Sequence, residues 1–281
     1  MAVPLALRRS LATPRGFIPA IVLVLLVIAA LFAPWIAPAP YDAQSLPNAY
    51  LPPSAANWLG TDEFGRDLFS RLVYGARISL GVAVASVAAC VSLGVLLGAL
   101  AGYFGGWFDR IVMAGVDITW SFPEILIALV LIAILGPGLG STAIAITIGY
   151  MAQFARLTRA QIIALKAETY IEATVNLGAS HGHILFRHLI PNALTPVLVA
   201  GMLAIGDAIV LEATLGFFGL GAQPPLPSWG AMLHGGVAQI YLAPWVVIFP
   251  GVTIAMTVIA INLFGDALID ALDIRNRLKE R

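Results

Sequence analysis

Residues 178–182 match the Gly-x-Ser-x-Gly pattern of serine hydrolases, with Ser180 in the place of the nucleophile. That chemistry needs a strand before the serine, an oxyanion hole, and distant acid and histidine partners. Here the match spans a predicted elbow between two short helices. We therefore interpret it as coincidental and expect no catalysis by this chain.

Three histidines near the same elbow could suggest a metal site, because imidazole is a common zinc ligand. No cysteine lies near them, and no helix carries a His-Glu-x-x-His pattern. Histidines that face solvent or a partner protein are the better interpretation, so we expect no metal and no cofactor on this chain. The three are His181, His183 and His188.

Four acidic residues lie in or beside otherwise apolar stretches, where a carboxylate costs on the order of 3 kcal/mol at the centre of a bilayer. One interpretation is that they line a polar passage, with Glu212 best placed for its outer end. The other is that each makes an interhelical hydrogen bond or lies close to the membrane interface. The four are Asp117, Glu124, Asp207 and Glu212.

The composition is that of a membrane protein. Apolar residues make up 60%, charged residues 11%, and the mean hydropathy is +0.93, which excludes an ordinary soluble domain. The formal net charge is zero, so global charge indicates neither a nucleic acid nor an acidic surface as a partner. We predict an all-α membrane protein embedded in the lipid bilayer.

Six stretches approach the twenty or so apolar residues that a helix needs to cross the hydrocarbon. The third and fourth are separated by Gly136-Pro137-Gly138, which predicts a turn. The third span is long enough only if it starts near Ile111, which places Asp117 and Glu124 inside or near the membrane. The predicted spans are 17–36, 80–103, 112–135, 140–157, 193–215 and 244–262.

Basic residues test this topology. Only Arg66, Arg71 and Arg77 fall on the predicted outer side, whereas twelve basic residues fall on the inner side, in agreement with the positive-inside bias. Both ends of the chain are therefore expected in the cytoplasm. The inner residues are Arg8, Arg9, Arg15, Arg110, Arg156, Arg159, Lys166, Arg187, Arg275, Arg277, Lys279 and Arg281.

The segment 216–243 is apolar but too rich in glycine and proline for one regular helix. We predict a re-entrant or interfacial scoop on the external side. Trp229 and Trp245 near its ends are expected at headgroup depth.

Two further patterns predict local packing. Gly94, Gly98 and Gly102 recur every four residues, which gives a smooth stripe for close approach of another helix. The external loop before the second span carries opposite charges that predict a local salt-bridged structure. Its charged residues are Asp62, Glu63, Arg66 and Asp67.

The loop between the fourth and fifth spans is a polar, basic island. Residues 167–177 have helical character, and Gly178 follows where a helix end favours a left-handed residue. Ser180 can cap a second short helix, which Pro191 must end or kink. The sequence predicts two short cytoplasmic helices at a glycine elbow.

This island resembles the EAA loop of ABC-importer permeases. That pattern is Glu-Ala-Ala, three residues, Gly, nine residues, Ile, one residue, Leu-Pro, and Glu172, Ala173, Gly178 and Pro191 have the correct spacing. The chain departs from the pattern at three positions, and the histidine fits the Arg-His-Leu-Ile-Pro-Asn form of peptide-type importers. The departures are Thr174, His188 and Ile190.

Three other segments resemble the C-type permease subunit of dipeptide and oligopeptide importers, so the likeness covers nearly the whole chain. They are residues 59–67, 216–230 and 265–273. The resemblance implies a type I ABC-importer permease fold with cytoplasmic coupling helices. It divides the chain into an N-terminal region of residues 1–74, a transmembrane domain 75–267 containing the coupling loop 166–190 and the scoop 216–243, and a cytoplasmic tail 268–281.

The resemblance also implies a function and partners. The chain would form half of a pathway for di- or oligopeptides, or for a related solute such as nickel or glutathione, in a bacterial plasma (inner) membrane. It would work with a second permease, two cytosolic ATPases that bind ATP and Mg, and an external binding protein. The residues expected to couple to an ATPase are Glu172, Ala173, Gly178, Ala179, Ser180, Arg187 and Pro191.

The chain lacks a P-loop of its own, because its only lysines, Lys166 and Lys279, do not follow a glycine. ATP hydrolysis would thus belong to the partner subunits. Two alternatives remain at this point: a secondary transporter driven by protons through the four membrane acids, and a membrane scaffold without a passage.

Overall fold

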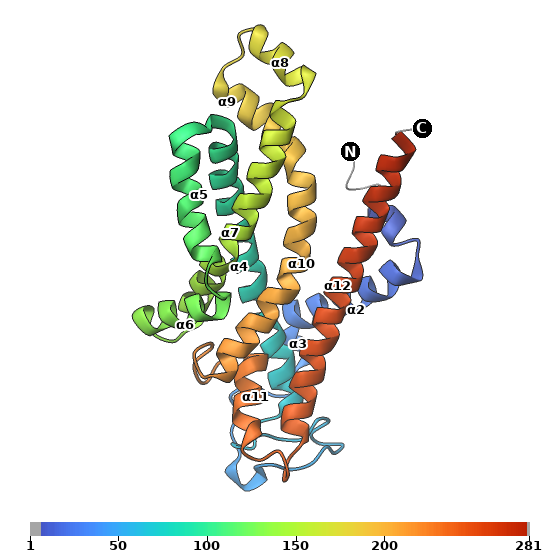
Figure 1. Ribbon diagram of the computed structural model, residues 1–281. Coiled ribbons are helices and arrows are strands. Elements are labelled where there is room, and N and C mark those ends of the chain that lie inside the picture. The colour runs from blue at the N-terminus through green and yellow to red at the C-terminus, as the bar shows by residue number, and fades with distance from the viewer. Residues whose placement is uncertain (1–6, 280–281) are drawn as a thin grey trace.

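The computed structural model describes residues 7–279, and for 272–279 only the backbone is described. Apart from an isolated bridge between Thr61 and Asp67 and a few turns, the regular structure in that range is helical. The main helices are α2 (Pro14–Leu31), α4 (Leu68–Phe104), α5 (Gly106–Trp120), α6 (Glu124–Leu135), α7 (Leu139–Lys166), α8 (Thr169–Asn176), α9 (His181–His183), η2 (Ile184–Leu189), α10 (Ile190–Phe217), α11 (Trp229–Val237) and α12 (Trp245–Lys279), with short pieces α3 (Ala33–Ile36) and η1 (Leu46–Asn48) (Figure 1).

Four helices are long and apolar enough to cross a membrane. They are α2, α4, the continuous helix His181–Phe217 and the Trp245–Ala271 stretch of α12. Counting the bent pair α5 and α6 as one span would give five. The prediction of six spans is therefore confirmed only in part among the described residues.

The third predicted span, 112–135, is wrong as a single helix. Its two halves, α5 and α6, are bent by 93° at a short break, and α6 points away from the bundle at about mid-height in Figure 1. The cause is Pro123, which precedes α6, lacks an amide hydrogen and disfavours a helical conformation at Phe122. At 12 residues, α6 is about 18 Å long and too short to cross the hydrocarbon alone.

The fourth predicted span, 140–157, lies within α7, which has 28 residues but is not among the helices apolar enough to count as spans. This helix packs against α4, α5, α6 and α10. Thr142 and Thr158 are fully buried, and so are Phe154 and Ala155. Packing against neighbouring helices accommodates these two threonines, while other side chains of α7, such as Ile144 and Ile163, remain exposed.

The glycine stripe of α4 packs against α7, as the sequence predicts. A side-chain carbon on Gly94 would lie 2.5 Å from Cβ of Phe154, and one on Gly98 would collide with the carbonyl oxygen of Ala155. Only glycine allows the two helices to approach this closely at these positions.

The two ends of the bundle carry different structures (Figure 1). The short helices α8 and α9 form one end, and α11 and the loop around residues 37–67 form the other. The first and last described residues lie toward the α8 end, so the described chain begins and ends on that side of the bundle's middle.

The segment 216–243 is interrupted by turns around α11, as its glycine and proline content predicts. Trp229 is fully buried and its indole nitrogen donates a hydrogen bond of 3.1 Å to the carbonyl of Leu72. The indole of Trp245 donates to the carbonyl of Thr61. Trp229 thus joins the scoop to α4 and has no lipid-facing surface, whereas Trp245, at the start of α12, joins that helix to the loop before α4.

Replacement of Gly98 by alanine is expected to destabilise the protein by about 1–3 kcal/mol, because the added methyl group forces α4 and α7 apart. Thermal unfolding of the detergent-solubilised protein measures this effect. Gly81→Ala is the matched control, since Gly81 lies on the same helix with no atom within 4 Å of the added carbon. Equal loss of stability in both variants would contradict the packing argument.

Candidate functional site

The elbow between α8 and α9 is a helix-ending motif that depends on glycine. Gly178 has a φ of +79°, a conformation that other residues rarely adopt. Its amide donates to the carbonyl of Val175, and the amide of Ala179 donates to the carbonyl of Thr174. These two bonds form a Schellman motif, which confirms the predicted glycine elbow.

The second helix of the elbow begins as the sequence predicts. The Ser180 hydroxyl accepts a hydrogen bond from the amide of His183 at 3.4 Å, so Ser180 caps α9.

The expectation that Pro191 ends or kinks this helix is wrong. The chain instead adopts a π-helical stretch, η2, in which the amide of Ile190 donates to the carbonyl of Leu185, five residues earlier. The wider turn accommodates a proline, which has no amide to donate. The second arm of the elbow is therefore continuous with α10.

The predicted coupling residues lie together on the surface of this end of the bundle. All are exposed except Ala179, which is half-buried. The sequence analysis missed the apolar side chains beside them: Leu177 is 87% exposed, and Val175, Phe186 and Tyr170 are also exposed. Apolar residues in a polar loop were the available signal, because exposed apolar side chains are typical of interaction surfaces.

The opposite side of the loop is anchored to the bundle. Ile171 of α8, Ile184 and Leu185 pack with Ala99 of α4 and Ile162 of α7 in one buried cluster. Next to it lies a cavity of about 500 Å³ between α8 and the end of α4. Its lining includes Glu172, Asn176, Lys166, His181 and Tyr103.

The loop before α4 is held by salt bridges, as the sequence predicts. The Asp62 carboxylate accepts from Nε of Arg66 at 2.6 Å, pairs with Arg71 at 3.1 Å and accepts two backbone amides. Arg66 also pairs with Glu63 at 2.7 Å. Asp67 has a different role, because it caps α4 by accepting the amide of Ser70.

Tyr50 belongs to the same loop and is affected by its burial and by two nearby carboxylates. Burial first, and then the neighbouring carboxylates of Glu63 and Asp62, raise the pKa of the Tyr50 hydroxyl. The hydroxyl is therefore protonated at neutral pH and can act as a hydrogen-bond donor.

Among the four membrane acids, Asp117 has a basic partner. Its carboxylate accepts from Arg156 of α7 at 2.5 Å, and the guanidinium also lies over the ring of Trp120. A second bridge between the same helices joins Asp109 to Arg159. These ion pairs hold α5 against α7. They support the interpretation that Asp117 makes an interhelical hydrogen bond.

Glu124 lies in a polar cleft formed where the break between α5 and α6 meets α7. The cleft has a volume of about 500 Å³, and its lining includes Ser121, Tyr150 and Gln153. Asp207 of α10 lies near Glu124 and Tyr150. The structure thus brings Glu124 and Asp207 to one region.

Glu212 is placed differently, with no exposed surface. Its polar neighbours are the hydroxyls of Ser79 and Ser228, yet both carboxylate oxygens lack a hydrogen-bond partner within the described residues. In this conformation the carboxylate lies inside the subunit, between α10, α4 and α11, and does not reach an open passage. Its predicted role in a pathway stays a prediction.

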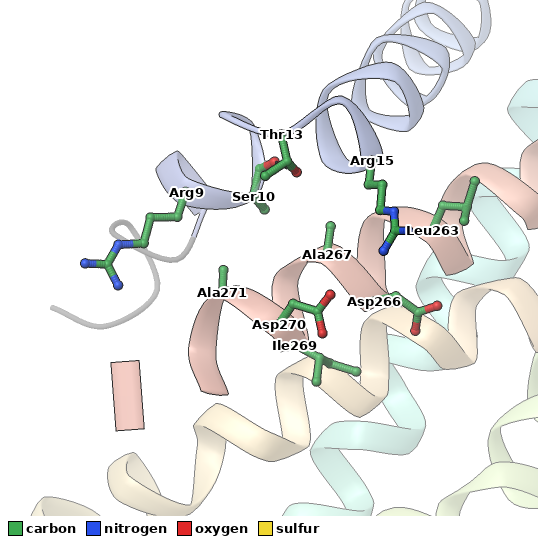
Figure 2. Close-up of a pocket in the computed structure, with 10 residues that line it drawn as sticks. All are labelled: Arg9, Ser10, Thr13, Arg15, Leu263, Asp266, Ala267, Ile269, Asp270 and Ala271. Carbon is green, nitrogen blue, oxygen red and sulfur yellow. Dashed lines mark hydrogen bonds between the residues drawn. The ribbon is translucent and has the colours of Figure 1, made fainter. Parts of the chain in front are cut away.

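A further cavity of about 540 Å³ lies between the segment before α2 and the C-terminal half of α12 (Figure 2). Arg9 and Arg15 come from one side, and Asp266 and Asp270 from the other, so both signs of charge line it. None of the predicted site residues contributes to this cavity. Among the described side chains, no three His, Cys, Asp or Glu residues are placed to hold one metal ion.

Comparison with known protein families identifies the class of membrane protein to which this helical bundle belongs. The family described as "Binding-protein-dependent transport system inner membrane component" matches residues 94–278, and the "N-terminal TM domain of oligopeptide transport permease C" matches residues 5–53. These two matches define an inner-membrane transport component.

Two curated relatives narrow the class. A dipeptide transport system permease protein, DppC, of Alkalihalophilus pseudofirmus is 44% identical over 253 residues, covering 90% of this chain and 83% of the relative. A glutathione transport system permease protein, GsiD, of Shigella flexneri is 46% identical over 257 residues, covering 90% and 84%. The chain belongs to the ABC-importer permeases of the dipeptide and oligopeptide family.

Solved structures support the fold. A chain of the MetNI methionine ABC transporter in an inward-facing conformation matches with a TM-score of 0.58 and 24% identity, covering 73% of this chain and 97% of that one. The chain is thus a multi-span, mostly helical inner-membrane permease with a fold similar to that transporter. Permease subunits of this family are not themselves enzymes.

Replacement of Asp62 by alanine is expected to destabilise the loop before α4 by about 3–5 kcal/mol, because two buried guanidinium groups lose their shared carboxylate. Limited proteolysis of the loop around residues 37–67 measures the change. Glu63→Ala is the control, since that side chain is 27% exposed and its bridge contributes no more than about 1 kcal/mol. Similar proteolysis rates in both variants would contradict the central role of Asp62.

Proposed function

We propose that this chain forms half of the translocation pathway of an ATP-driven importer for dipeptides, glutathione or a related small polar solute. The observation that carries the proposal is the exposed glycine elbow at one end of the bundle. Exposed apolar side chains flank it, and a buried cluster anchors it to the bundle. Such a surface fits a protein partner, and relatives named for dipeptide and glutathione transport support the substrate class.

The proposed assembly contains a second permease, two cytosolic ATPases and an external binding protein. The elbow end would face the cytoplasm, since basic residues concentrate on that side, and α7 would cross the membrane inside the bundle as the fourth of six spans. Both termini would then be cytoplasmic. ATP and Mg would be bound by the ATPases.

Coupling would follow from the continuity of the elbow with α10. Movement of an ATPase that grips α8 and α9 would be transmitted along η2 into a helix that crosses the bundle. Gly178 sets the angle between the two arms, and the exposed Glu172 and Arg187 supply polar contacts around the apolar tip. The bundle would alternate between outward and inward access as the ATPases close and open.

The proposed passage includes the cleft around Glu124 and the neighbouring Asp207. Broken helices are tolerated at membrane depth where they line a polar cavity, and α5 and α6 break beside this cleft. The sequence has no lysine or arginine from 111 to 155 or from 188 to 274. A passing ammonium group would therefore find negative charge without a competing cation from these segments.

Purification of the tagged chain from native membranes in mild detergent tests the assembly. Stoichiometric recovery of a second permease and P-loop ATPases is the expected result. A lone chain or a homo-oligomer, in a detergent that preserves other multi-subunit transporters, would contradict the proposal and favour a proton-driven transporter.

Gly178→Val is expected to leave the chain in the membrane but to lower ATPase association and uptake at least tenfold, because valine cannot adopt the left-handed elbow without strain. Co-purification and uptake in proteoliposomes measure these effects. Gly182→Val is the matched control, since Gly182 lies in α9 with open space around it and no positive φ. Gly178→Asn should retain more activity, because asparagine tolerates this conformation.

Glu124→Gln is expected to lower uptake by about tenfold while the complex still assembles, because the cleft loses its charge but keeps its shape. Initial uptake rates in proteoliposomes, at a saturating concentration of binding protein, measure the effect. Leu126→Gln, at an exposed position two residues further along α6, controls for a polar change on the same helix. Unchanged uptake in Glu124→Gln would remove Glu124 from the proposed passage.

A further inference from the structure

The cytoplasmic end of α4 is joined to both ends of the loop that contains α8. Before α8, the ammonium group of Lys166 donates a hydrogen bond of 2.6 Å to the carbonyl of Tyr103. After α8, Nδ1 of His181 lies 2.8 Å from the Tyr103 hydroxyl. We call Tyr103, Lys166 and His181 the Tyr103 clasp.

The clasp is also packed. The ring of His181 meets the ring of Tyr103 edge-on at 5.7 Å between centroids, and the Lys166 ammonium lies 5.4 Å from the centre of the same ring. Tyr103 itself packs against the buried cluster that holds Ile171 of α8. One side chain of α4 therefore contacts the segments on either side of α8.

The hydrogen bond between Tyr103 and His181 does not depend on one protonation state of the imidazole. A phenol both donates and accepts, so it bonds to Nδ1 as an acceptor and to Nδ1–H as a donor. The connection therefore persists in either tautomer and in the charged form.

The other end of α4 is also held by side-chain contacts. Asp67 caps its first turn, and Arg71 joins it to Asp62 of the external loop. Between the two ends α4 is one unbroken helix of 37 residues, about 55 Å long. A displacement applied at Tyr103 is therefore carried to the external loop without an intervening break.

We propose that the Tyr103 clasp transmits movement of the α8–α9 loop to α4, so that Tyr103, Lys166 and His181 are positioning residues for transport. This inference rests on the proposed function, because it assumes that an ATPase moves the loop. It adds a second route to the one through α10. The α10 route begins after the elbow, whereas the clasp moves the external loop through a different helix.

The test uses the reconstituted complex of both permeases, the ATPases and the binding protein. Four quantities are measured for each variant: co-purified ATPase, basal ATP hydrolysis, hydrolysis stimulated by loaded binding protein, and uptake. Tyr103→Phe removes only the hydroxyl, and His181→Ala removes its partner. Each is expected to retain ATPase and basal hydrolysis while stimulation and uptake fall roughly three- to tenfold.

Two comparisons separate transmission from a structural role. The double variant should lose no more stimulation than either single variant, because both substitutions remove the same hydrogen bond between Tyr103 and His181. His181→Asn should recover some of the loss, because its amide lies near the position of Nδ1. Tyr74→Phe is the matched control, since Tyr74 packs on Tyr41 near the external end of the same helix.

Wild-type stimulation in Tyr103→Phe would overturn the inference. A parallel fall of basal hydrolysis, stimulated hydrolysis and folded protein would also overturn it, because that pattern indicates loss of structure. Absence of ATPase from the wild-type complex would instead refute the proposed function, and that result is seen before any variant is compared.

Discussion

The close approach of α4 and α7 is the constraint on which the rest of the bundle depends. Glycines on α4 face Phe154 and Ala155 of α7, so the two backbones meet where side chains would otherwise keep them apart. In a bilayer the hydrophobic effect does little to hold helices together, and tight packing has to replace it. Helices α5, α6 and α10 pack against one or both members of this pair, and the loop that joins α7 to α10 lies at its end.

The pairing also determines where polar groups are tolerated. The three threonines of α7 are buried against neighbouring helices, and its two arginines form ion pairs with α5. The acids that lack such partners lie elsewhere: Glu124 at a helix break and Glu212 between three helices. Polar residues in this protein therefore mark either a seam between helices or a cleft.

Several features were predictable from the sequence because their causes are local. The glycine elbow, the Ser180 cap and the glycine stripe depend on single residues whose conformational or steric properties are specific. The break at Pro123 also has a local cause, because a proline within an apolar stretch interrupts a helix. The prediction of one continuous span over 112–135 rested on the length of the apolar stretch instead. The presence of proline at position 123 is therefore sufficient to predict that 112–135 is not one helix.

Other features depend on contacts between distant segments and could not be predicted. Nothing in the local sequence of Tyr103 indicates that it meets His181, and the burial of the threonines on α7 follows only from where the other helices pack. The π-helical path before Pro191 has the same origin, because a kink and a wider turn both satisfy the proline. Packing between elements decided which of these occurs.

That wider turn makes the direction of the α8–α9 loop depend on chain length. A π-helical turn holds one residue more than an α-helical turn, and each residue of an α-helix rotates the chain by about 100°. Loss of a single residue between Ile184 and Leu189 would turn α9 around the axis of α10 by roughly that angle. Relatives of this chain should therefore keep the number of residues across this stretch, along with apolar side chains at the buried positions of Ile184, Leu185 and Leu189.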